Sequence, residues 1–260
     1  MFSLNYGGLF AAICGSHTDV VLDNVVLFFA FLLLSIAAGY LLGSVNTAIV
    51  ISKVFYRDDI RKYGSGNAGM TNMLRTFGGK AAIGVLVGDM LKTVLAIFIG
   101  GVLFGFGYVN AFSLGYNSDY MMFMGIGTYT AGLAAVLGHI FPVYYGFRGG
   151  KGVLVSATMA LMLSPILFLI MFAVFVLIVA TTKYVSLGSV TSAILYPILV
   201  HGFFRMYQMT APPTILLVTI LVACIIVFAH KENLKRISNR TERQLSFKKK
   251  EKEQRDADAE

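Results

Sequence analysis

Residues 63–79 carry the clearest chemistry in the sequence and read Tyr-Gly-Ser-Gly-Asn-Ala-Gly-Met-Thr-Asn-Met-Leu-Arg-Thr-Phe-Gly-Gly. Gly64, Gly66 and Gly69 let the backbone turn several N–H groups toward one point. Side chains that donate hydrogen bonds lie among and just after these glycines, at Ser65, Asn67, Thr71, Asn72 and Arg75. Such a cluster is suited to holding a phosphate group. The alternative is an ordinary flexible loop between two apolar segments.

A second glycine-rich segment lies at residues 138–152 and ends in Gly149, Gly150, Lys151 and Gly152. A nucleotide-binding P-loop is excluded, because that motif needs Gly where Tyr145 stands and Ser or Thr where Gly152 stands. The segment instead predicts an anion-binding turn, with Lys151 as a point charge at the start of a helix. The alternative is a basic turn that only sets membrane topology. His139, on an apolar face, is more typical of a hydrogen-bonded packing residue than of a catalyst, which is the alternative.

Three further polar groups lie beside apolar stretches. Ser186 and Ser189 precede an apolar run, where they would act as helix caps or as ligand donors. His230 and Asn233 are three residues apart and share one helical face, as a polar helix end also would. Asp89 and Lys92 lie within an apolar stretch, about 14 Å deep for Asp89 if that helix starts near residue 80. They pair with each other or face a polar cavity.

The composition around these motifs is that of a membrane protein. The chain is 57% hydrophobic with a mean hydropathy of +0.76. Only 13% of its residues are charged, whereas a soluble domain carries about a quarter. Apolar runs of the length that crosses a bilayer as a helix recur near residues 25–56, 81–106, 121–141, 153–180, 187–203 and 214–229.

The placement of basic residues predicts the topology. Lys and Arg concentrate in alternate connections, 53–80, 148–151 and 183, and in the C-terminal tail. The bias of these residues toward the cytoplasm puts the N-terminus outside and the tail inside. Six crossings would place the tail outside, so we favour a hairpin at Ser164–Pro165 that divides the fourth run in two. The predicted fold is an all-α polytopic membrane protein with about seven transmembrane helices.

This topology divides the chain into three parts. Residues 1–24 are predicted to be an extracytoplasmic N-terminal segment, residues 25–230 a transmembrane domain with cytoplasmic glycine-rich loops, and residues 231–260 a charged cytoplasmic tail. The net charge of +8 comes largely from the loops and the tail, and is suited to anionic membrane lipids. Nucleic-acid binding is not expected, because no basic stripe with interleaved aromatic residues occurs in a soluble module.

Several familiar catalytic patterns are missing from the sequence. It contains no Gly-x-Ser-x-Gly nucleophile elbow, no His-Glu-x-x-His zinc motif and no His followed five residues later by Asp. The two cysteines, at positions 14 and 224, have no disulfide or metal spacing. We therefore expect neither a metal nor a cofactor.

Taken in order, these motifs resemble the bacterial acyl-phosphate:glycerol-3-phosphate acyltransferase family, the PlsY family. The resemblance covers residues 43 to about 242. It rests on the 64–75 segment, the Asp89 and Lys92 pair, residues 138–142, the 149–152 segment, residues 184–187, and His230 with Asn233. The sequence departs from the family pattern at Asn46, Thr93, Leu154 and Arg240, where the family usually has Pro, Gly, Ala and Gly.

The resemblance implies an activity and a site. The enzyme would transfer an acyl chain from acyl phosphate to the sn-1 hydroxyl of glycerol 3-phosphate, giving lysophosphatidic acid and phosphate at the cytoplasmic side of the bacterial plasma membrane. The enzyme that makes acyl phosphate is an implied partner. Catalytic roles fall on Ser65, Arg75, Lys151, His230 and Asn233. Phosphate binding falls on Gly66, Asn67, Gly69, Thr71, Asn72, Gly149, Gly150, Gly152, Ser186 and Ser189.

Two other classes of function compete with this assignment. A membrane transporter of a phosphorylated anion would also use broken spans and glycine-rich loops. Against it, the polar motifs are predicted to gather on one side rather than at mid-membrane in paired halves. A non-catalytic membrane scaffold would leave the two predicted anion sites without a purpose.

Overall fold

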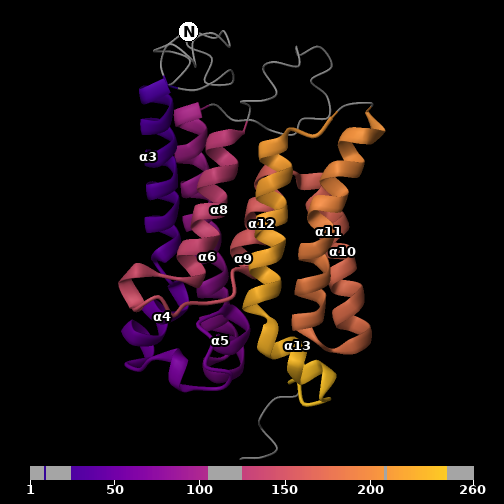
Figure 1. Ribbon diagram of the computed structural model, residues 1–260. Coiled ribbons are helices and arrows are strands. Elements are labelled where there is room, and N and C mark those ends of the chain that lie inside the picture. The colour runs from indigo at the N-terminus through magenta and orange to yellow at the C-terminus, as the bar shows by residue number, and fades with distance from the viewer. Residues whose placement is uncertain (1–8, 10–24, 105–124, 208–209, 245–260) are drawn as a thin grey trace, which may run out of the picture.

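The computed structural model describes residues 9, 25–104, 125–207 and 210–244 (Figure 1). Every regular element in these ranges is helical, as predicted. Most of the predicted N-terminal segment 1–24, the ends of two predicted spans at 105–106 and 121–124, and residues 245–260 of the tail lie outside the described residues. The elements are α3 (Val25–Ser44), α4 (Thr47–Tyr56), η2 (Ile60–Lys62), α5 (Met70–Phe77), α6 (Gly79–Phe104), α8 (Ile126–Ile140), η3 (Val143–Tyr145), α9 (Val153–Leu163), α10 (Pro165–Thr182), α11 (Val185–Met206), α12 (Pro213–Ala229) and α13 (Lys231–Ser238).

Helix length and composition support five or six of the predicted crossings. Five segments within the described ranges are long and apolar enough to span a bilayer: Val25–Tyr56, Gly79–Phe104, Ile126–Tyr145, Pro165–Thr182 and Val185–Met206. Helices α12 and α13 meet at a bend of 56° and count as a sixth when taken together. Helix α9 has 11 residues, which corresponds to about 17 Å, roughly half of the hydrocarbon core. A seventh crossing therefore remains a prediction.

The predicted break in the fourth apolar run is confirmed. Helix α9 ends at Leu163 and α10 begins at Pro165. Between them Ser164 leaves the helical region, with φ −150° and ψ 67°. Proline lacks the N–H that would continue α9, but it is favourable in the first turn of a new helix, where that N–H has no partner anyway.

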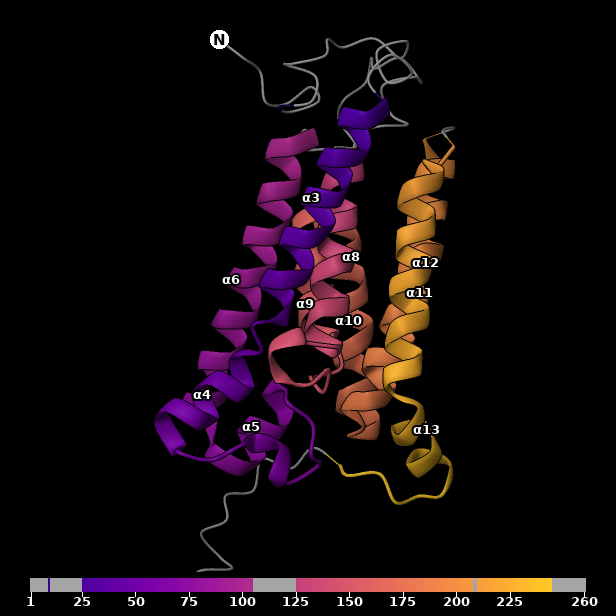
Figure 2. The same cartoon turned by 60° about the vertical axis from the view of Figure 1, so that its left-hand side comes forward.

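The basic connections meet at one end of the helical bundle. Figures 1 and 2 show α4, α5 and α13 together at that end, whereas α3 begins at the other. Arg61 of η2 donates hydrogen bonds to the backbone oxygens of Tyr145 (2.9 Å) and Arg148 (3.2 Å). These bonds hold the loop after α8 against the connection between α4 and α5. Segments about 85 residues apart in the sequence are thereby brought side by side.

Small residues let α3 and α8 approach until their backbones touch. A Cβ atom added at Gly39 would lie 2.4 Å from the backbone oxygen of Ala131, and one at Gly43 would lie 2.3 Å from that of Ala135. Only glycine fits at such close crossings, and small residues are the usual means of close helix packing in membranes. The contact fixes the last turns of α3 and α8 relative to each other, which matters because both turns adjoin the polar residues of the site.

The largest apolar core lies among α6 and α8 to α12. It includes Ile97, Tyr129, Met159, Val200 and Val222, each of which is 2% exposed or less. Part of this core, including Met171, Tyr196, Val222 and Ile226, also borders the cavity described next.

Candidate active site

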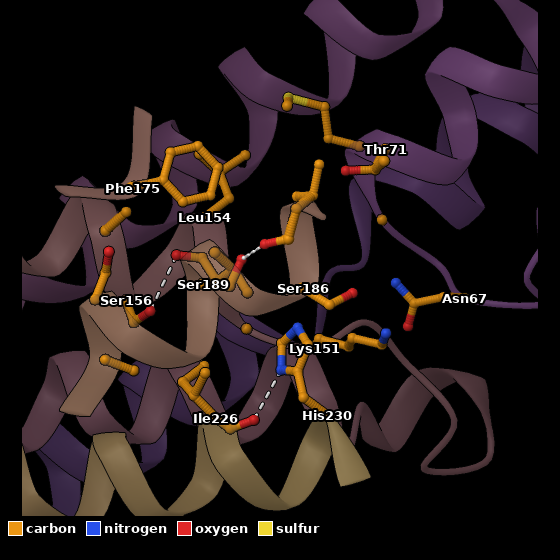
Figure 3. Close-up of a pocket in the computed structure, with 18 of the residues that line it drawn as sticks. Asn67, Thr71, Lys151, Leu154, Ser156, Phe175, Ser186, Ser189, Ile226 and His230 are labelled. Atoms are coloured by element: carbon orange, nitrogen blue, oxygen red, sulfur yellow. Dashed lines mark hydrogen bonds between the residues drawn. The ribbon is translucent and has the colours of Figure 1, made fainter. Parts of the chain in front are cut away.

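A cavity of about 560 Å³ lies where the glycine-rich loop, α5, α9, α11 and α13 meet. Its polar end contains most of the residues that the sequence predicts for the site: Ser65, Asn67, Gly69, Thr71, Asn72, Arg75, Lys151, Gly152, Ser186, Ser189, His230 and Asn233. Figure 3 shows Asn67, Lys151, Ser186 and His230 directed toward this shared space. Residues more than 150 positions apart in the chain are therefore neighbours here.

The glycine-rich loop, residues 64–69, is held in shape by one buried side chain. Asn72 is 2% exposed. Its Oδ1 accepts from the Ser65 N–H (3.0 Å), and its Nδ2 donates to the backbone oxygens of Tyr63 (3.0 Å) and Asn67 (3.1 Å). Gly64 has φ +58°, and a Cβ there would lie 2.2 Å from Asn72 Oδ1. Because both Nδ2 hydrogens have acceptors in the loop, Asn72 organises the loop, and direct phosphate binding by it stays a prediction.

Four predicted ligands remain free to bind a substrate. Among the described residues we find no hydrogen-bond partner for the side chains of Ser65, Asn67, Thr71 and Arg75, and all four line the cavity. Burial lowers the pKa of Arg75, and the neighbouring Arg243 lowers it further. An arginine still keeps its charge at neutral pH, because its ordinary pKa is above 12. A half-buried guanidinium without a counterion in direct contact is a strong attraction for an anion.

Three helix N-termini open into the same cavity. Helix α5 follows Gly69, α9 follows Gly152 and α11 follows Tyr184, and none of these starts is capped by a side chain of the described residues. The cavity lining includes residues from each first turn, namely Met70 and Thr71, Val153 and Leu154, and Val185 and Ser186. The first N–H groups of a helix have no partner within the helix and carry a partial positive charge. Their convergence creates a site for anions.

Lys151 is the cation closest to the start of α9. Burial lowers its pKa to about 8, an effect that the nearby Arg236 and Arg75 reinforce and that Glu242 opposes. Its Nζ donates to Oδ1 of Asn233. Lys151 is therefore mostly protonated at neutral pH, and it loses its proton at a pH only slightly above neutral.

The two predicted residues at the α12–α13 bend are oriented by short contacts. Nδ1 of His230 lies 2.8 Å from the backbone oxygen of Ile226 (Figure 3). A carbonyl oxygen can only accept, so a neutral His230 carries its proton on Nδ1 and offers an Nε2 lone pair. Asn233 donates through Nδ2 to Ser186 Oγ (2.8 Å). Ser189 also lines the cavity, but its hydroxyl donates to the Val185 backbone oxygen of its own helix (2.9 Å).

Sequence analysis missed Glu242. Its Oε1 accepts from Ser186 Oγ (2.7 Å) and Asn233 Nδ2 (2.6 Å), and its Oε2 pairs with Arg236 Nε (2.8 Å). Burial raises the pKa of Glu242, but the bonds from Asn233, Ser186 and Arg236 outweigh it and hold the pKa below its ordinary value. A charged carboxylate therefore ties α11, α13 and the chain after α13 together. The only signal in the sequence was the family-like Thr-Glu pair at 241–242.

Three predicted phosphate ligands, Gly66, Gly149 and Gly150, lie outside the cavity lining, and their role in phosphate binding stays a prediction. Their amide hydrogens are bonded to backbone oxygens, Gly66 to Tyr63 (2.9 Å), Gly149 to Ile140 (3.0 Å) and Gly150 to His139 (3.1 Å). Gly149 and Gly150 thus donate to the last carbonyl groups of α8, because a helix end leaves carbonyl groups that need donors.

Much of the remaining cavity wall is apolar. Leu161 of α9, Phe168, Met171 and Phe172 of α10 and Val222 of α12 contribute to its wall. Phe168 and Phe172 stack with ring centroids 5.7 Å apart. The cavity therefore joins a polar end, suited to anions, to a wall suited to a hydrocarbon chain.

Comparison with known proteins gives one consistent group. Residues 33–240 match the family described as Glycerol-3-phosphate acyltransferase. The chain is 38% identical over 218 residues to a glycerol-3-phosphate acyltransferase of Thermoanaerobacter pseudethanolicus, covering 84% of this chain and 98% of the relative. It is 39% identical over 228 residues to one of Bacillus cytotoxicus, covering 87% and 100%.

Two solved structures are also similar to the chain. One is PlsY (YgiH), described as an integral membrane glycerol 3-phosphate acyltransferase in its glycerol 3-phosphate form. It has a TM-score of 0.68 and 31% identity, over 83% of this chain and 96% of that one. Its lysophosphatidic acid form has a TM-score of 0.66 and 30% identity, over 83% and 95%.

Proposed function

Because the chain belongs to the glycerol-3-phosphate acyltransferase family, we propose that it transfers an acyl chain from acyl phosphate to the sn-1 hydroxyl of glycerol 3-phosphate. The products are lysophosphatidic acid and phosphate. The observation that carries the proposal is the convergence of three uncapped helix N-termini on one cavity that also contains Arg75 and Lys151. Both substrates of this reaction carry a phosphate.

Two phosphates must be neutralised separately if both substrates bind at once. We assign Arg75 and the start of α5, with Ser65, Asn67 and Thr71, to one phosphate. Lys151 and the start of α9 serve the other. Asn233 donates to Ser186 and Glu242, Ser186 donates to Glu242, and Asn233 Oδ1 positions the Lys151 ammonium, so direct phosphate binding by Ser186 and Asn233 stays a prediction. Two anions a few ångströms apart repel strongly in a site of low dielectric, so each needs its own cation. The free donors of the first group support this division.

The acyl chain lies along the apolar wall. Ser186 and Tyr196 both line the cavity and are ten residues apart on α11, about 15 Å along the axis. The hydrocarbon core of a bilayer is about 30 Å thick, so each leaflet contributes about 15 Å. The cavity therefore has the length of a membrane lipid chain.

The donor is a mixed anhydride and is already activated, so direct attack is sufficient. The sn-1 oxygen forms a bond to the acyl carbon, the bond between that carbon and the phosphate oxygen breaks, and phosphate leaves. The hydroxyl proton passes to a phosphate oxygen or to Nε2 of His230, which is a hydrogen-bond acceptor in the tautomer described above. The chain supplies orientation and positive charge for the developing oxyanion, and these can lower a barrier by several kcal/mol.

The membrane setting of this reaction is part of the proposal. The end of the bundle that contains α4, α5 and α13 faces the cytoplasm of a bacterial plasma membrane, because the basic connections gather there. Seven crossings result if α9 and α10 form a hairpin within the transmembrane domain 25–230. Residues 1–24 then lie outside the cell, and the tail 231–260 lies inside.

The decisive test is a reaction without vesicles. The purified protein in detergent is supplied with acyl phosphate and glycerol 3-phosphate, and lysophosphatidic acid and phosphate are measured. We expect equal amounts of both products, and loss of both in Arg75→Ala. The matched control is Arg148→Ala, since Arg148 is exposed and outside the cavity lining. A protein that carries a phosphorylated anion into vesicles but forms no lysophosphatidic acid would be the transporter.

A further inference from the structure

His139 is buried at the wall of the cavity, and the reaction proposed above gives it no role. It lies near the end of α8, is 4% exposed and lines the cavity. Its Nδ1 is 3.0 Å from Nζ of Lys92 and 3.6 Å from Oδ1 of Asp89. Asp89 and Lys92 themselves pair at 2.8 Å. The pairing predicted from the sequence is confirmed, and Asp89 faces the cavity as well.

The surroundings of Lys92 determine which ring nitrogen of His139 carries the proton. Nζ of Lys92 donates to the backbone oxygens of Gly43 (3.0 Å) and Val45 (2.8 Å) and to the Asp89 carboxylate. These three groups can only accept, so Nζ must be an ammonium with three donors and no lone pair. It cannot accept a hydrogen bond from Nδ1. The Asp89 carboxylate could accept from Nδ1, but at 3.6 Å it is too far away for a hydrogen bond. Nδ1 is therefore the unprotonated nitrogen, and it accepts from Nζ at 3.0 Å.

The neutral His139 ring then carries its proton on Nε2. Within the described part of the chain we find no hydrogen-bond partner for Nε2. A Cβ atom placed on Gly150 would lie 2.1 Å from Nε2 and 2.7 Å from the backbone oxygen of Ala68. Nε2 thus lies against Gly150, where the glycine-rich loop meets the loop before α9. An N–H left unpaired in so buried a ring is costly unless a ligand completes it.

Resting on the proposed function, we propose that His139 contacts substrate, donating a hydrogen bond from Nε2 to a phosphoryl oxygen. Phosphoryl oxygens only accept, so this tautomer is the one that can bind them. Lys92 acts as a positioning residue, because it fixes the tautomer from behind the ring. The charges of Asp89 and Lys92 cancel, so the Asp89–Lys92–His139 group presents an uncharged Nε2–H to the site. His139 and His230 then offer substrate opposite hydrogen-bonding roles, His139 as a donor and His230 as an acceptor.

Two substitutions of similar size separate this contact from a packing role. The amide nitrogen of Gln reaches the position of Nε2, whereas that of Asn reaches only the position of Nδ1. We expect His139→Asn to raise KM for one phosphorylated substrate about ten- to hundredfold, the value of one hydrogen bond to a charged group. His139→Gln should stay within about threefold of the parent protein. The substrate whose KM rises, acyl phosphate or glycerol 3-phosphate, identifies the phosphate that is bound.

The tautomer can be measured directly in the unmodified protein. The sequence has four histidines, and comparison with His139→Gln assigns the ¹⁵N imidazole signals of His139. We expect a protonated Nε2 and an unprotonated Nδ1, with the Nε2 signal shifting when glycerol 3-phosphate or inorganic phosphate is added. A proton on Nδ1, signals that ignore both ligands, or equal losses in the Asn and Gln variants would overturn the proposal. The two NMR results are independent of whether the parent protein makes lysophosphatidic acid, which alone decides the proposed function.

Discussion

Replacing Lys151 by Arg should remove the alkaline limit of the activity. The pKa of Lys151 is lowered to about 8 because the side chain is buried. The protonated fraction therefore falls about tenfold between pH 7 and pH 9. If the ammonium binds a substrate phosphate, kcat/KM should fall by the same factor, since that ratio reports groups of the free enzyme. An arginine stays charged throughout this range.

The assay measures kcat/KM for each substrate from pH 6.5 to 9.5 in the parent protein and in Lys151→Arg, after subtraction of spontaneous acyl phosphate hydrolysis. We expect a decline above about pH 8 in the parent only. The limit on kcat should lie at higher pH, because bound phosphate raises the pKa of the lysine. The absolute rate of the Arg variant is expected to be lower, since a planar fork replaces a point charge.

Unfolding at high pH does not explain such a decline. Above about pH 8 the native state loses the Lys151 proton, while the unfolded state keeps it up to about pH 10. The unfolded state then binds more protons, so this group increases stability as pH rises. An identical alkaline decline in the parent and in Lys151→Arg would refute the assignment of Lys151 to phosphate binding.

Further predictions concern the other parts of the site. Arg75→Lys should lose activity despite the retained charge, because Lys lacks the bidentate fork; near-normal turnover with unchanged KM for both substrates would contradict this. Glu242→Ala should lower the free energy of unfolding by about 2 kcal/mol, because Ser186, Asn233 and Arg236 lose their shared acceptor; Glu242→Gln, which keeps one acceptor oxygen, should lose less, and equal losses would speak against the bonds. Cysteines placed singly at Ser65, Ser156 and Thr241, in a Cys-free background, should resist an impermeant thiol reagent in intact cells and react once the cells are opened; labelling of Thr241→Cys in intact cells would exclude the seven-span topology.

Local patterns in the sequence were sufficient for much of the site. The loop at 64–69, Arg75 on the following helix and Lys151 before α9 are all set by short-range features: glycines that permit positive φ, and a charge placed at a helix start. The break at Ser164 is likewise local, since Pro165 cannot continue the preceding helix. These features need no knowledge of tertiary contacts.

Other roles depend on contacts between distant residues. Glu242 and Ser186 are 56 positions apart, and no spacing rule connects them. Asn72 looks like a ligand in the sequence, but burial turns its amide toward the loop backbone, a common alternative for Asn side chains. The amide hydrogens of Gly149 and Gly150 are bonded to the last carbonyl oxygens of α8. His139 could be assigned only after Lys92 was seen with three acceptors around it.

The central claim is that both phosphorylated substrates occupy one cavity together and react directly. Initial rates measured at varied concentrations of acyl phosphate and glycerol 3-phosphate test it most directly. We predict double-reciprocal lines that intersect, and no acylated protein after incubation with radiolabelled acyl phosphate alone. Parallel lines together with a trapped acyl-serine or acyl-cysteine would show a covalent intermediate, and would contradict the account.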